Sequence, residues 1–282
     1  MNATPPPPPH PPGAPPPPGN AAPADGLRFA FGTLTVLPVR VPRWDRAAAR
    51  SGMLCAPLAG LAIGLAAGGV SWAFLALETG WLLTAVLTVT TMAALSRGLH
   101  LDGLADTADG LGSGKPAAEA LDVMRRSDIG PFGVIALVCT LLAQIAALYE
   151  LYGHGRGYAV TAVVLAGLVS RTALTWACRS GVPAARPDGL GAVVAGSVPR
   201  GTAAAVAGAV ALAAAVAGGL AGEPTAAGAV VGVCAVVLAL SAAELLVQHC
   251  RRRFGGVTGD VLGAVAEGAA AVTLLVLTVG GT

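Results

Sequence analysis

The chain has 282 residues, of which 55% are hydrophobic and 11% are charged. A soluble domain carries about 25% charged residues, so this composition excludes a soluble enzyme and indicates an integral membrane protein. The net charge of +2 is too small to indicate nucleic-acid binding. The five cysteines have no short spacing, which argues against a zinc site or a disulfide framework and favours small apolar packing residues.

The first 25 residues form a low-complexity segment that holds 12 of the 21 prolines. Such a composition favours solvated polyproline II and cannot build a core, so we expect residues 1–25 to be a disordered tail. No basic stretch followed by an apolar one is present, so we do not expect a signal peptide there. Residues 26–282 are expected to form a single transmembrane domain.

From residue 53 onward, apolar runs alternate with short charged segments. A helix needs about 17–25 residues to cross the hydrocarbon, and six runs are long enough. The run 81–96 is short, and we expect it to be a short or re-entrant segment. The sequence thus predicts an all-α polytopic membrane bundle with about seven transmembrane helices. The runs are 53–77, 81–96, 132–151, 159–178, 202–222, 225–247 and 261–280.

The first run carries glycines at every fourth position, Gly60, Gly64 and Gly68. Small residues at this spacing let helices approach closely inside a membrane. We therefore expect this stripe to be a helix-packing surface.

The basic residues indicate the orientation in the membrane. With the N-terminus in the cytoplasm, 15 of the 17 lysines and arginines fall in cytoplasmic segments; Arg156 falls outside and Arg171 lies within a helix. Cytoplasmic loops carry such an excess of basic residues. We therefore expect a multi-pass protein of a bacterial-type inner (cell) membrane, with its N-terminus and its active-site loops in the cytoplasm.

The segment 97–131 is the longest expected loop of the membrane domain, and it contains Asp102, Asp106 and Asp109. On a helix these three residues would lie within about 60° of one another. Their repulsion would be relieved by a divalent cation, and hard oxygen ligands suit Mg²⁺, which commonly shares its site with substrate phosphates. The aspartates alternate with Leu, Ala and Thr, which argues against a merely solvated acidic loop. The spacing therefore predicts a magnesium and phosphate site.

Several other polar residues belong to the same predicted side. Arg125 and Arg126 either hold phosphate through their guanidinium groups or anchor the chain at the membrane boundary, and both interpretations remain open. Arg171 and Glu267 lie inside apolar runs, where a charge is costly and usually functional. Arg171 could pair with an aspartate or with a substrate phosphate.

The remaining candidates flank helices. The last glycine-rich loop, with Thr258 and Asp260, precedes a helix N-terminus, which suits anions. Asp260 could equally cap that helix or add a carboxylate to the metal site. His100 directly precedes the aspartates, and Ser127 precedes a helix; each could contact substrate or serve as a cap.

The segment 100–111, His-Leu-Asp-Gly-Leu-Ala-Asp-Thr-Ala-Asp-Gly-Leu, resembles the signature of the cobalamin synthase family, the adenosylcobinamide-GDP ribazoletransferases. The segments 34–39, 124–133, 170–171 and 255–264 resemble further blocks of that family in the same order. The resemblance covers about 27–282. In the family pattern an acidic residue often precedes the serine of the second block, whereas here Arg126 precedes Ser127 and Asp128 follows, which makes a separate role for Asp128 doubtful.

The resemblance implies an enzyme that joins adenosylcobinamide-GDP to α-ribazole or its 5′-phosphate at the membrane, with Mg²⁺ as cofactor and GMP as leaving group. In this hypothesis Asp102, Asp106 and Asp109 bind the metal, and one of them accepts the hydroxyl proton. Arg171 acts in catalysis by holding phosphate. The sequence leaves the oligomeric state open, a homo-oligomer included. The expected substrate-binding residues are His100, Arg125, Ser127, Arg171, Thr258, Asp260 and Glu267.

Two alternatives belong to other classes. A CDP-alcohol phosphotransferase also uses several aspartates and Mg²⁺, but the Ala-Arg pair of its motif is missing here. A cation-coupled transporter would place its ion site near the midplane, often within repeated halves, and no internal repeat is visible. Release of GMP by the purified protein would separate an enzyme from a transporter.

Overall fold

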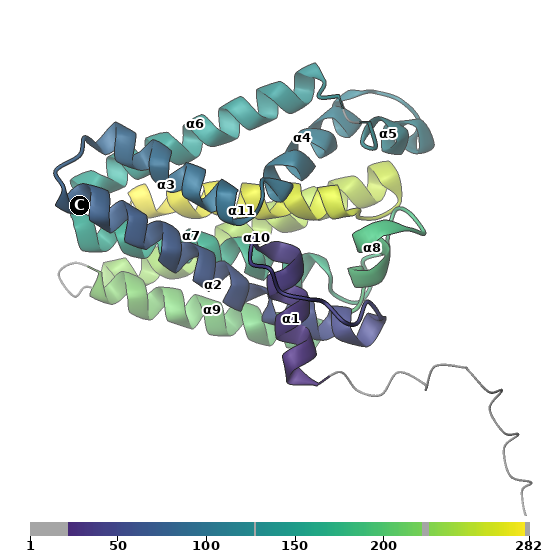
Figure 1. The fold of residues 1–282 in the computed structure, drawn as a ribbon, viewed down its shortest axis with the longest axis horizontal. Helices are drawn as coiled ribbons and strands as arrows, with labels where there is room; N and C mark the ends of the chain where they lie inside the picture. The colour runs from purple at the N-terminus through teal and green to yellow at the C-terminus, as the bar shows by residue number, and fades with distance from the viewer. Residues whose placement is uncertain (1–21, 127, 222–225, 280–282) are drawn as a thin grey trace, which may run out of the picture.

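The computed structural model describes residues 22–126, 128–221 and 226–279. Most of the expected tail and Ser127 lie outside these ranges. Pro23, Ala24 and Asp25, the last residues of the expected tail, form the beginning of the first helix. The described residues form eleven helices, shown in Figure 1: α1 Pro23–Leu34, α2 Arg46–Ala76, α3 Trp81–Leu95, α4 Leu99–Gly112, α5 Ala117–Val123, α6 Pro131–Gly153, α7 Arg156–Ala177, α8 Gly189–Val194, α9 Arg200–Leu220, α10 Ala226–Phe254 and α11 Gly259–Thr278.

Six of these helices, α2, α6, α7, α9, α10 and α11, are long and apolar enough to cross a membrane. The 15-residue α3 is too short alone, but α3 and α4 pass the same test together as a pair bent by 89°. The prediction of an all-α polytopic protein with one short or re-entrant segment is therefore confirmed. The prediction of a plain loop over 97–131 is wrong, because this segment contains α4 and α5.

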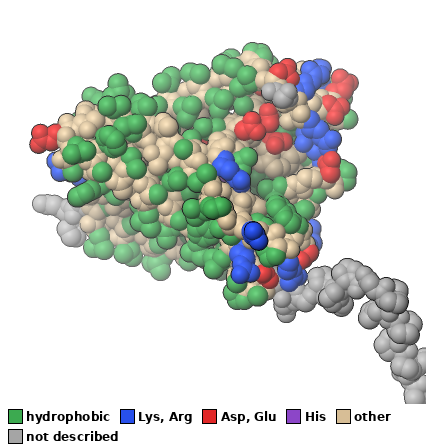
Figure 2. All heavy atoms as spheres, in the orientation of Figure 1, with side chains coloured by type: hydrophobic (Ala, Val, Ile, Leu, Met, Phe, Trp, Pro, Cys, Tyr) green, Lys and Arg blue, Asp and Glu red, His purple; other side chains and the backbone are tan. Residues whose placement is uncertain are grey.

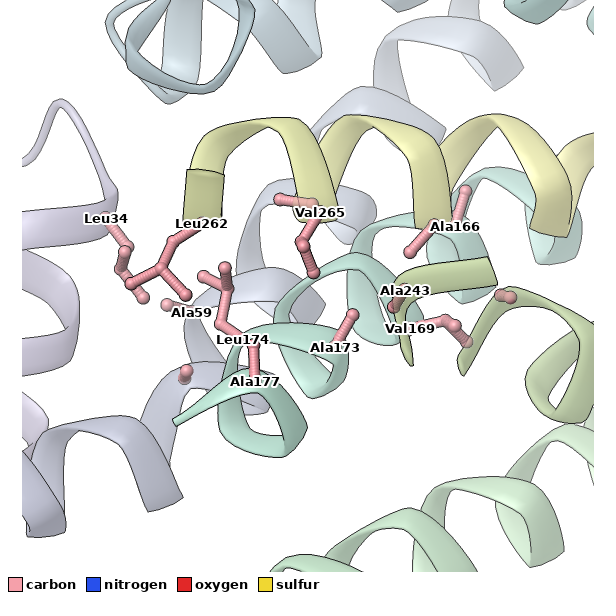
Figure 3. Packing of buried hydrophobic residues seen from close by; sticks show 14 of the residues in the cluster. Leu34, Ala59, Ala166, Val169, Ala173, Leu174, Ala177, Ala243, Leu262 and Val265 are labelled. Carbon is pink, nitrogen blue, oxygen red and sulfur yellow. The ribbon is translucent and has the colours of Figure 1, made fainter. Parts of the chain in front are cut away.

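The core lies around α7 and α11. In each of these two helices, 72% of an apolar stretch of 18 residues is buried inside the protein. The corresponding share is 17% in α9 and 22% in α6. Figure 3 shows α7 presenting Ala166, Val169, Ala173, Leu174 and Ala177 to neighbouring helices. The side chains at this centre are mostly small, so the backbones approach closely. The outer helices instead present exposed apolar side chains, as expected of a surface that faces lipid.

The glycine stripe on α2 packs against α7. A methyl group at Gly60 would collide with the carbonyl oxygen of Gly167, and one at Gly64 would lie 2.8 Å from the carbonyl oxygen of Val164. At Gly68 the nearest atom is a side-chain carbon of Val160, at 3.3 Å. The structure thus confirms the expected helix-packing role of this stripe.

Close backbone contacts also fix the position of α4 against α11. A methyl group at Gly103 would lie 2.6 Å from the carbonyl oxygen of Asp260. One at Gly263 would lie 3.0 Å from the carbonyl oxygen of His100. Glycine on both helices therefore seats the aspartate-bearing helix directly on the buried α11, while α6 covers α4 from the other side (Figure 1).

Candidate active site

An open cavity of about 720 Å³ lies beside α4, between the α3–α4 bend, the segment 124–129 and α6. Its wall carries carboxylates on α4 and guanidinium groups on the segments before and after α4. We call it the α4 cavity. Its lining residues are Arg97, Gly98, Leu99, Leu101, Asp102, Ala105, Asp106, Met124, Arg125, Arg126, Asp128, Ile129 and Leu137.

Two of the three motif aspartates line the α4 cavity. Asp102 is exposed, and Asp106, one helical turn later, is half-buried. Asp106 lies within electrostatic range of the carboxylates of Asp102, Asp109 and Asp260. The repulsion inferred from the sequence is therefore present, and a fourth carboxylate contributes to it.

Three arginines line the same cavity, namely Arg97, Arg125 and Arg126. Arg125 forms an ion pair with Asp188 at 2.8 Å in which both side chains are at least half exposed. Such a pair is weak in water, so Arg125 can exchange this partner for a phosphate. Arg126, for which anchoring and phosphate binding were both open, lines the cavity as well.

Sequence reasoning missed Arg97. It lies at the α3–α4 bend, where Arg97 and Gly98 both have positive φ angles, of 57° and 68°. Its guanidinium group donates hydrogen bonds to the carbonyl oxygens of Gly32 and Thr33 at the end of α1. The signal available in the sequence was the Arg-Gly pair directly before the aspartate motif, since glycine commonly ends a helix in this conformation.

Asp109 differs from the other two motif aspartates. It is buried, it does not line the α4 cavity, and both its oxygens accept backbone hydrogen bonds, from Gly130 at 2.7 Å and Gly133 at 2.9 Å. These N–H groups belong to the N-cap and the first turn of α6, where the helix dipole favours a negative charge. Asp109 therefore closes the N-terminus of α6 and ties it to α4.

Arg171 lies in the interior of the protein rather than in the α4 cavity. One of its terminal nitrogens lies 2.9 Å from His100 Nδ1, and the other donates to Ser170 Oγ at 3.0 Å. A guanidinium group can only donate, so His100 accepts through Nδ1 and carries its proton on Nε2. His100 and Arg171 thus do not line the cavity; they form a buried link between the first turn of α4 and the middle of α7.

Glu267 is buried near Arg171 and accepts a hydrogen bond from Gln144 at 3.0 Å. Glu267 and Arg171 both line a separate internal cavity of about 10 Å³, which is the space that one water needs. The structure therefore brings Glu267 close to Arg171, as a pair of intramembrane charges would require, but away from the α4 cavity.

The C-terminal candidates Thr258 and Asp260 do not line the α4 cavity, although the carboxylate of Asp260 acts electrostatically on Asp106. The hydroxyl of Thr258 caps α11 by accepting from the backbone of Val261, so the observed cap is Thr258 and not Asp260. Asp260 lies 3.6 Å from the guanidinium group of Arg186, a residue that sequence reasoning did not select. Burial lowers the pKa of Arg186 below its usual value, and Asp260 opposes this shift.

The donor set allows a test of the expected magnesium site. In the part of the chain that the structure describes, no group of three or more His, Cys, Asp or Glu side chains is arranged to hold a metal ion. Mg²⁺, however, is commonly bound by one or two carboxylates together with waters and substrate phosphates. Asp102 and Asp106, one turn apart on an open cavity, fit that arrangement.

The charges are concentrated at one end of the molecule. Figure 2 shows acidic and basic side chains gathered at the end where α5 and α8 lie in Figure 1, while apolar side chains cover the flanks of the visible face. The α4 cavity belongs to this end, because Arg125, Arg126 and Asp128 line it. The α4 cavity therefore lies at the charged end of a membrane bundle.

The fold and this cavity define a polytopic membrane protein with a polar site at one end of its helices. The family model described as Cobalamin-5-phosphate synthase matches residues 26–278, and the chain belongs to this family. It is therefore a transferase of cobalamin biosynthesis that acts in the assembly of the nucleotide loop.

Among its relatives, a protein of Frankia casuarinae named adenosylcobinamide-GDP ribazoletransferase is 44% identical, over 89% of this chain and 93% of the relative. A protein of a Nocardioides species with the same name is 46% identical, over 89% of this chain and 97% of the relative. No solved structure matches this chain.

Proposed function

We propose that this transferase joins adenosylcobinamide-GDP to α-ribazole or its 5′-phosphate in a Mg²⁺-dependent reaction that releases GMP. The observation that carries this proposal is the α4 cavity, where three carboxylates and three arginines line one open space of about 720 Å³. A diphosphate needs positive partners and a metal, and a substrate with a corrin ring needs a wide opening. The names of the relatives support this choice of substrates.

The reaction forms one bond and breaks another at the same phosphorus atom. A ribazole hydroxyl oxygen attacks the phosphorus attached to the cobinamide arm, the bond to the bridging oxygen breaks, and GMP leaves with that oxygen. We assign to Asp106, which is more buried than Asp102, the acceptance of the hydroxyl proton. Arg125 and Arg126 hold the diphosphate by charge-assisted hydrogen bonds.

Asp102 and Asp106 are the proposed ligands of Mg²⁺. When bound, the ion neutralises the diphosphate and stabilises the charge that develops on the departing phosphate. Asp109 was expected to be a third ligand, but both its oxygens already accept hydrogen bonds from α6. We therefore assign it the positioning of α4 against α6 rather than direct contact with the metal.

The proposed location is a bacterial-type cell membrane, with the α4 cavity open to the cytoplasm. The support is the gathering of Arg97, Arg125 and Arg126 with most other basic residues at one end of the bundle, which the positive-inside rule places in the cytoplasm. Reporter fusions after α5 and after α6 test this orientation. A cytoplasmic reporter should be active after α5 and inactive after α6, and the reverse result would contradict it.

The decisive experiment is a transferase assay of the purified chain in nanodiscs, with adenosylcobinamide-GDP, α-ribazole 5′-phosphate and varied Mg²⁺, in which GMP and the corrinoid product are quantified. Asp102→Asn and Asp106→Asn should each lower kcat/KM by about 10²-fold or more, and chelation of Mg²⁺ should abolish turnover. The matched control is Glu119→Gln on α5, an exposed acid outside the cavity. Near-normal activity of both aspartate variants, or full activity without Mg²⁺, would overturn the proposal.

A further inference from the structure

An apolar groove of about 510 Å³ opens between α7, α9 and α10, and it shares no residue with the α4 cavity. A second hollow of about 400 Å³ lies further along α10 and has two arginines in its wall. The apolar groove is lined by Trp176, Ala204, Ala207, Val237, Leu240, Ser241, Glu244 and Leu245. The basic hollow is lined by Pro183, Gln248, Arg251, Arg252 and Gly255.

The two hollows continue along one face of α10. Their α10 residues follow each other at intervals of three or four, through Ser241, Glu244, Gln248 and Arg251, which is the spacing of neighbours on one helix face. At 1.5 Å per residue, Leu245 and Arg251 are about 9 Å apart along the helix axis. The apolar groove is therefore followed along α10 by a pair of cations.

The position of the basic hollow along α10 matches the boundary of the membrane. The first 22 residues of α10, 226–247, extend over about 33 Å, close to the hydrocarbon thickness of about 30 Å. Arg251 and Arg252 in the last turn of α10 then lie at the level of the lipid headgroups. Trp176, in the wall of the groove, is of a residue type enriched at that boundary.

The acidic residue in the groove, Glu244, does not repel an anion placed at the mouth of the groove. The carboxylate of Glu244 lies 2.6 Å from Arg179, accepts from Trp176 at 2.8 Å and accepts from Gln248 at 2.9 Å. Its charge is thereby compensated inside the protein. Arg251 and Arg252 are exposed and give the mouth of the groove a positive charge.

We propose that this groove binds one anionic phospholipid, with an acyl chain along the apolar part and the phosphate between Arg251 and Arg252. The apolar walls are open to the bilayer, since 53% of Val237 and 67% of Leu245 are exposed. Basic residues at the membrane surface attract anionic headgroups. A zwitterionic lipid fills the apolar part equally well but lacks the net charge that the arginines match.

Native mass spectrometry of the full chain, released from detergent with added phosphatidylglycerol or phosphatidylcholine of identical acyl chains, tests the proposal. Wild type should retain phosphatidylglycerol at least about fivefold better than phosphatidylcholine. The double variant Arg251→Gln/Arg252→Gln should bind both lipids equally. Ser241→Trp, which fills the apolar part, should lower retention of both lipids, with Ala207→Phe as a second groove-filling variant.

Matched controls carry the same chemical changes elsewhere. Arg40→Gln/Arg50→Gln removes two exposed charges, and Leu238→Trp enlarges a side chain on α10 outside the groove; both should retain lipid like wild type. Equal retention of the two lipids by wild type, or unchanged selectivity in the double arginine variant, would overturn the proposal. Conversion of a dimer to a monomer by Ser241→Trp without any change in lipid retention would also overturn it, because the groove would then be an interface between copies.

Discussion

The Oδ2 atom of Asp109 lies 2.7 Å from the backbone nitrogen of Gly130, directly before the first turn of α6. Its other oxygen accepts from Gly133 in that same turn. A methyl group at either glycine would lie 2.5 Å from an oxygen of the carboxylate, so a side chain at either position would displace the carboxylate from these hydrogen bonds. The third aspartate of the motif, Asp109, therefore holds α4 against α6. These two helices form part of the wall of the α4 cavity.

Replacing Asp109 should lower the free energy of unfolding rather than act directly on the reaction. Asp109→Ala leaves two helix-terminal N–H groups, one buried and one partly buried, without their acceptor, so we expect the free energy of unfolding to fall by about 2–4 kcal/mol. Asp109→Asn keeps one acceptor oxygen and should cost about half as much. Thermal unfolding in detergent measures both changes, and Asp102→Ala, at an exposed position, is the control that should leave the Tm nearly unchanged.

The same variants separate a positioning role from a metal-binding role. If Asp109 positions α6, the folded fraction of Asp109→Asn should show the same dependence on Mg²⁺ concentration as wild type. Asp106→Asn should need far more Mg²⁺. A shift in Mg²⁺ dependence as large for Asp109→Asn as for Asp106→Asn would instead show that Asp109 is a ligand of the metal ion.

The buried contact between Arg171 and His100 leads to a second prediction. Arg171→Ala removes a hydrogen bond to His100 and leaves Glu267 buried without a nearby cation, so we expect a loss of about 3–5 kcal/mol in stability. The remaining folded protein should have a nearly normal KM, because Arg171 does not line the α4 cavity. Tm and KM of the same preparation check this.

Arg126→Ala supplies the matched comparison, since it removes an arginine from the cavity wall itself. It should leave the Tm nearly unchanged and raise the KM for adenosylcobinamide-GDP. A raised KM with an unchanged Tm in Arg171→Ala would show that Arg171 holds phosphate after all.

The general architecture could be predicted because its causes are local. Runs of apolar residues give the six membrane-crossing helices, and the glycine stripe at Gly60 and Gly64 gives the α2–α7 contact. The motif at Asp102 and Asp106 could be predicted for the same reason, since helical spacing alone places both side chains on one surface.

The partners of the polar residues could not be predicted, because they come from distant segments. Arg171 meets His100 across 71 residues and Asp109 meets Gly130 across 21. A spacing argument groups Asp109 with the other aspartates, whereas the small rotation between them turns it towards α6. Arg97 was missed because its place in the cavity depends on the 89° bend between α3 and α4.

The ion pair between Arg125 and Asp188 yields a third prediction. Because both side chains are exposed, Asp188→Asn should change the free energy of unfolding by less than about 1 kcal/mol. It should also leave the KM for adenosylcobinamide-GDP equal or lower, since it frees Arg125 for phosphate. Arg125→Gln should raise that KM about tenfold. Steady-state kinetics of Asp188→Asn and Arg125→Gln measure these two effects. Equal rises in KM in the two variants would show that the ion pair acts as a unit.

The contact between Gly60 and Gly167 tests the packing that supports the whole site. A methyl group at Gly60 would collide with the backbone of α7, which leaves no flexible atom to move aside. We expect Gly60→Ala to cost about 1–3 kcal/mol. Gly69, on the same helix, has no atom within 4 Å of an added methyl group, so Gly69→Ala should be neutral or slightly stabilising. Thermal unfolding in detergent compares the two variants, and equal Tm values would show that the α2–α7 contact is looser than the structure indicates.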